Sequence, residues 1–199
     1  MSEVKDDLLG YLQRGRDVLV WKLEDASELD VRRPLTPTGT NLLGLVKHLV
    51  AVESGYLGEV FGRPFPEPVP WAADDAEPES DMWATPEESR AELVALYRRV
   101  WAHSAATVAA LDLTATGTVP WWPEERRHPT LHRVLVHLVA ETQRHAGHAD
   151  IVRELVDGAA GMLPDVSNLG TADAGGQAAH RARVQAAAEE AAGRQARPR

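Results

Sequence analysis

Three side chains in this sequence have the types and the spacing of a metal site. Glu141 and His145 stand four residues apart in the run ETQRHAGHAD, which places them one turn apart on the same face of a helix. His48 stands in LLGLVKHLVAVE, where it shares a helix face with leucine and valine side chains. Two imidazoles and one carboxylate around a divalent ion, with a fourth position open, are typical of catalytic zinc. The open position could take water or an incoming thiol.

The helix that carries Glu141 brings further polar groups to its apolar side. A helical wheel places four polar residues in one sector, together with apolar Val134, Leu138 and Val152: these are His137, Glu141, His145 and His148. His132 falls on the opposite side and is expected to face water. A buried carboxylate is costly without a cation or hydrogen-bond donors, and a metal ion would supply the cation. His148 is a candidate substitute ligand, or a group that contacts a ligand without binding the metal itself.

Each of these residues also has an ordinary structural interpretation. His48 could be a core histidine whose hydrogen bonds are satisfied, and Glu141 could pair with Arg144 or with an arginine of another helix. His137 and His148 could lie at the rim of the bundle. Because a glutamate and a histidine at this spacing occur in many helices by chance, the pattern alone leaves both interpretations open.

The composition excludes several classes of function. The chain of 199 residues carries a net charge of −9, which argues against nucleic acid as a partner. It contains no cysteine, so disulfides, thiolate ligands and a protein thiol nucleophile are all excluded. No run approaches the roughly 18 apolar residues of a membrane span. The charged N-terminal run MSEVKDDLLGYLQRGRD is unlike a signal peptide, so we expect a cytoplasmic protein without a membrane partner.

The apolar periodicity predicts helices almost throughout. We expect four long ones, at about Val4–Ala26, from a cap at Thr40 or Asn41 to Phe61, from a capping box at Thr85-Pro86-Glu87-Glu88 to Leu111, and from a cap at Thr130 to Gly158. LDVRRPLTPTGT reads as a connector, and residues 62–84 form a proline-rich, acidic linker typical of a site lid or a crossing connection. Trp121 and Trp122, in a further connector, could form the mouth of a pocket or simply pack.

These elements predict an all-α protein, a four-helix bundle with long crossover connections and a short C-terminal helical tail. We expect the bundle domain to span residues 1–170. The alanine-rich remainder, 171–199, is expected to be a short helix that is partly disordered.

Several stretches resemble the DinB/YfiT-like superfamily of helical bundles, and within it an actinobacterial branch. They are WKLE, RRPLTPTGTNLLGLVKHLVAVE, GEVFGRPFP, VPWW and ETQRHAGHADIVREL, and the resemblance covers about residues 5–185. It implies a DinB-like bundle with a metal held by one residue of the second long helix and a pair on the fourth. Many members use three histidines. The pattern here is similar to the mycothiol-dependent maleylpyruvate isomerase branch, and it assigns the ligand roles to His48, Glu141 and His145.

The resemblance implies an enzyme that binds Zn2+, with Ni2+ or another divalent ion as alternatives. The ion would activate a low-molecular-weight thiol, mycothiol in preference to bacillithiol or glutathione, for S-transfer or isomerisation of a small electrophile. The missing cysteine fits this chemistry, since the sulfur would come from the cosubstrate. Two alternatives stay open: a metal-dependent hydrolase, and a non-catalytic stress-response or binding module that forms a homodimer.

Overall fold

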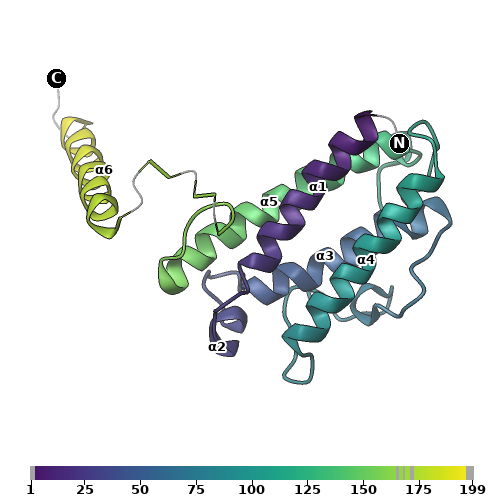
Figure 1. Ribbon diagram of the computed structural model, residues 1–199, viewed down its shortest axis with the longest axis horizontal. Coiled ribbons are helices and arrows are strands. Elements are labelled where there is room, and N and C mark those ends of the chain that lie inside the picture. The colour runs from purple at the N-terminus through teal and green to yellow at the C-terminus, as the bar shows by residue number, and fades with distance from the viewer. Residues whose placement is uncertain (1–2, 165, 168, 171–172, 196–199) are drawn as a thin grey trace. The chain divides into compact units, whose positions relative to one another are not determined.

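The computed structural model describes residues 3–164, 166–167, 169–170 and 173–195, and Figure 1 traces them. These residues form helices, turns and loops with no sheet among them, which confirms the predicted all-α class. None of these helices is long and apolar enough to span a bilayer. The helices are α1 (Glu3–Trp21), α2 (Glu28–Arg32), α3 (Leu42–Leu57), α4 (Arg90–Ala110), α5 (Leu131–Asp157) and α6 (Ala174–Gln195), with short 3₁₀ helices η1 (Glu59–Phe61), η2 (Pro70–Ala72) and η3 (Glu124–Arg126).

The chain divides between Ala160 and Gly161 into two compact units. In the first, α1 packs along α5, and α3 packs against both α4 and α5, which makes a four-helix bundle of α1, α3, α4 and α5 (Figure 1). Two long connections, residues 58–89 and 111–130, join α3 to α4 and α4 to α5. The predicted bundle is confirmed.

Apolar side chains hold α3 against α5. Leu57 of α3 and Leu131, Leu135 and Leu138 of α5 are fully buried in one cluster. Each such side chain contributes about 1.5–3 kcal/mol when it leaves water. This packing brings the polar positions of the two helices face to face.

The ends of α5 confirm the predicted caps. The Thr130 hydroxyl accepts a hydrogen bond from the Arg133 amide at 3.3 Å, and Gly158 takes a left-handed conformation with φ of 79°. The Asn41 side chain likewise accepts from the Gly44 amide at 2.7 Å and begins α3. Local sequence is sufficient to define these ends.

The predicted start of α4 at Thr85 is wrong. The Glu88 carboxylate does accept from the Thr85 amide at 2.7 Å, as in a capping box, but the helix begins only at Arg90, with Ser89 as its cap. The Arg32 guanidinium donates hydrogen bonds to the backbone carbonyls of Thr85 and Glu88, at 2.9 and 2.7 Å. Residues 85–88 are therefore bound to α2 and do not extend α4.

The first long helix is also shorter than predicted. It ends at Trp21, and the connector that follows contains the short helix α2, which the sequence analysis missed. Arg153 of α5 donates to the carbonyls of Lys22 and Glu24 at 2.9 and 2.6 Å. These long-range contacts satisfy carbonyls that a continuing helix would otherwise use.

The second unit contains α6, an alanine-rich helix with exposed side chains. Asp173 precedes it and accepts a hydrogen bond from the Gly176 amide at 2.7 Å. The helix agrees with the predicted C-terminal helical tail. Residues 171–172 and 196–199, which fall in the segment predicted to be partly disordered, lie outside the described residues.

Candidate metal centre

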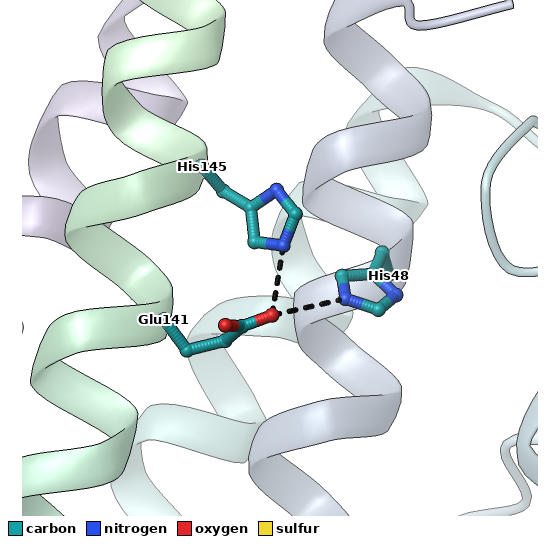
Figure 2. A group of neighbouring side chains, drawn as sticks. All are labelled: His48, Glu141 and His145. Atoms are coloured by element: carbon teal, nitrogen blue, oxygen red, sulfur yellow. Dashed lines mark hydrogen bonds and ion pairs between the residues drawn. The ribbon is translucent and has the colours of Figure 1, made fainter. Parts of the chain in front are cut away.

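The three predicted ligands converge between α3 and α5. His48 extends from α3, and Glu141 and His145 extend from successive turns of α5, so that all three point toward one another (Figure 2). Glu141 Oε1 lies 3.0 Å from His145 Nε2 and 3.8 Å from His48 Nε2. One ligand atom from each residue lies within 4.8 Å of the others. The helix spacing seen in the sequence therefore produces a real cluster.

The donor set fits a divalent ion. Bonds of about 2.1 Å around a tetrahedral zinc place ligand atoms roughly 3.4 Å apart, and the two distances to the Glu141 oxygen bracket that value. Two nitrogens and one carboxylate oxygen are ligands that zinc and nickel accept. His145 is buried. Its Nδ1 has no hydrogen-bond partner among the described residues, whereas its Nε2 faces the cluster.

The electrostatics of the cluster favour the ligand forms of its groups. Burial lowers the pKa of His145, and the neighbouring His48 lowers it further against the opposing attraction of Glu141. Burial alone would raise the pKa of Glu141. The attraction and hydrogen bond of His145, helped by His48 and His137, outweigh burial and lower it. At neutral pH the imidazole of His145 is neutral and the carboxylate of Glu141 is ionised, as a metal ion requires.

Asp81 lies behind His48 and was missed by the sequence analysis. Its Oδ2 lies 2.6 Å from His48 Nδ1, on the side of the ring away from Glu141. An N–H donated from Nδ1 to this carboxylate leaves the lone pair on Nε2, which faces the cluster. In the sequence, Asp81 stands out only as one acid of the 62–84 linker, because no local pattern assigns it a partner.

Residues 81–88, called the strap below, hold Asp81 in place by crossing α3. Asn41 Nδ2 donates to the Met82 carbonyl at 3.0 Å, and Lys47 Nζ donates to the Trp83 carbonyl at 3.0 Å. Gly44 lets the strap approach, since a Cβ there would lie 1.8 Å from the Met82 carbonyl oxygen. The strap therefore needs glycine at this point of α3.

A pocket of about 290 Å³ opens beside the cluster. The indole N–H groups of Trp121 and Trp122 both donate to the Tyr56 hydroxyl, at 3.0 and 2.8 Å. Of these two tryptophans, Trp121 lines the pocket, and Trp122 packs against the hydrophobic core. The lining residues are His48, Ala51, Val52, Gly55, Tyr56, Trp121, His137 and Glu141.

A family model for mycothiol S-transferases matches residues 7–158. The chain belongs to the mycothiol S-transferase family. The match spans α1 to the cap of α5 and includes the whole cluster. It ends close to the boundary between the two compact units. Among curated proteins, no match to the chain was found.

The remaining candidates take different places around this family's bundle. His148 is exposed, and its ring stands edge-on to His145 at 5.4 Å without joining the cluster. His137 lines the pocket, and burial lowers its pKa. His132 and Arg144 are exposed. The ion-pair partners found for Glu141 within the described residues are the two histidines, which disfavours the alternative pairing with Arg144.

Replacing Asp81 tests its role behind His48. We expect Asp81→Ala to weaken zinc binding by about 10–100-fold, because the His48 ring loses the acceptor that orients it. Competition with a chromophoric chelator measures the affinity. Asp75→Ala, an exposed acid of the same linker, is the matched control and should bind zinc as the wild type does. Equal affinities in the two variants would refute the role of Asp81.

Metal affinity should depend on pH in a defined direction. Protons compete with zinc for histidine nitrogens, so affinity should fall as the pH drops below about 6 and level off above about 7. Because the pKa of His145 is lowered, this imidazole takes up its proton at a lower pH than free histidine does. The pKa of Glu141 is also lowered, so this carboxylate stays ionised while the histidines titrate. Affinity that still rises steeply above about pH 8 would indicate a different ligand set.

Proposed function

We propose that this protein is a metal-dependent S-transferase that uses mycothiol as its cosubstrate. The observation that carries the proposal is the convergence of His48 Nε2, His145 Nε2 and Glu141 Oε1 beside a pocket, in a chain of the mycothiol S-transferase family. Zinc is the proposed ion, with Ni2+ or another divalent ion as alternatives.

The metal would supply Lewis-acid chemistry, lowering the pKa of a thiol that enters the pocket. The protein's own residues prepare the site for this. Glu141 contributes the negative charge, and Asp81 fixes the tautomer of His48. His145 is buried from water next to Glu141, which lines the pocket.

The cosubstrate must provide the nucleophile, because the chain has no cysteine. In transfer to an aryl chloride, the thiol sulfur forms a bond to the ring carbon and chloride leaves with its bonding electrons. The proton of the thiol passes to solvent. The apolar side chains of Ala51 and Val52 provide a partly dry wall for the electrophile. In an isomerisation the same sulfur would add to the substrate and later leave it.

Turnover of chlorodinitrobenzene tests this proposal. The zinc-loaded protein with mycothiol should form the aryl thioether at least about 100-fold faster than the metal-free protein, since thiolate is the reactive species. Glu141→Ala should lose this activity. His132→Ala, an exposed histidine on the same helix, should keep it.

Two outcomes would contradict the proposal in different ways. Hydrolysis of an ester that proceeds equally well without thiol would favour the hydrolase alternative. Stable zinc binding with no affinity for mycothiol in calorimetric titration would favour a non-catalytic binding module.

A further inference from the structure

A second cavity of about 330 Å³ adjoins the pocket of the metal centre. The two share Ala51, Gly55 and Trp121, so a ligand in one can extend into the other past the Trp121 side chain. The second cavity is formed by the outer face of α3 and the linker that follows it. Its polar lining includes Ser54, Glu59 and Glu67.

Trp121 stands at the junction as a fixed aromatic face. The side chain is 57% exposed, which is high for so large an apolar group. It is nevertheless held in place, since its indole N–H donates to the Tyr56 hydroxyl and its ring stands edge-on to the Tyr56 ring at 5.3 Å. Gly55 lies next to the ring, where a Cβ would make van der Waals contact with Trp121 Cη2 at 3.7 Å. An exposed ring that is oriented by a hydrogen bond and a ring contact is suited to stacking with a ligand.

The charge of the second cavity indicates which ligands it accepts. Among the described residues, its lining includes two carboxylates and a hydroxyl, and no lysine or arginine. Arg99 fixes the Glu67 carboxylate with two hydrogen bonds of 2.7 and 2.8 Å. Carboxylates accept hydrogen bonds from hydroxyl groups and repel anions. An aromatic face beside carboxylates is the chemistry that recognises a neutral sugar, through its C–H face and its hydroxyls.

We propose that this second cavity binds the carbohydrate part of the thiol cosubstrate, with Trp121 as the stacking platform. The inference rests on the proposed function and adds to it the basis of thiol selectivity. Mycothiol joins an acetylated cysteine to glucosamine and inositol and carries no carboxylate. Bacillithiol and glutathione each carry two carboxylates, which the Glu59 carboxylate in the lining of this cavity repels, whereas Arg99 already compensates the charge of Glu67.

A sulfur-free fragment, N-acetylglucosaminyl-inositol, in which a plain acetyl group replaces the acetylcysteinyl group of mycothiol, tests the site without the metal. Calorimetric titration of the metal-free full-length protein should show saturable binding of the fragment. Trp121→Ala and Glu59→Lys should each weaken it at least about tenfold, with circular dichroism confirming that both variants stay helical. Tyr11→Ala, another exposed aromatic residue and one that lines neither cavity, is the matched control and should bind as the wild type does.

Three results would overturn the proposal: no binding of the fragment to the wild type, equal binding to Trp121→Ala, or weakened binding in Arg133→Gln instead. Arg133 lines a different cavity of about 320 Å³, next to Trp122, so an effect there would move the sugar to that cavity. Fragment binding that persists while turnover fails would contradict only the proposed function. Turnover with mycothiol in the absence of fragment binding would contradict only the sugar site.

Discussion

The meeting of two imidazoles and one carboxylate between α3 and α5 is the constraint on which the site depends. Removing a carboxylate from water is costly unless a cation or donors compensate it. In this bundle the compensation comes from His145 and His48, whose attraction lowers the pKa of Glu141 in spite of burial. The leucine-rich packing of α3 against α5 brings these groups together, so the core determines the geometry of the proposed ligands.

The long connections between the helices also contribute residues to the site. The strap brings Asp81 to the outer nitrogen of His48, and Gly44 leaves room for it on α3. The 111–130 connection carries Trp121 to the pocket that His48 also lines. Each long connection therefore contributes one side chain to the site, as long loops in compact domains often do.

The sequence predicts those features that arise from short-range periodicity. The bundle class, the caps at Thr130 and Gly158, and the shared face of Glu141 and His145 all follow from residues within one or two turns of each other. The start of α4, helix α2 and the role of Asp81 depend on partners far along the chain. Arg32, for example, binds carbonyls more than fifty residues away, and no local pattern predicts that contact. Tyr56 likewise becomes part of the pocket only through the two tryptophans that donate to it.

Metal stoichiometry tests the central claim most directly. Elemental analysis of purified protein after zinc loading and gel filtration should find about one ion per chain in the wild type. It should find almost none in His48→Ala, Glu141→Ala or His145→Ala, because each variant removes one of three ligands. His148→Ala, which alters the neighbouring exposed imidazole, should retain the ion. Equal zinc content in the wild type and the three ligand variants would contradict the account.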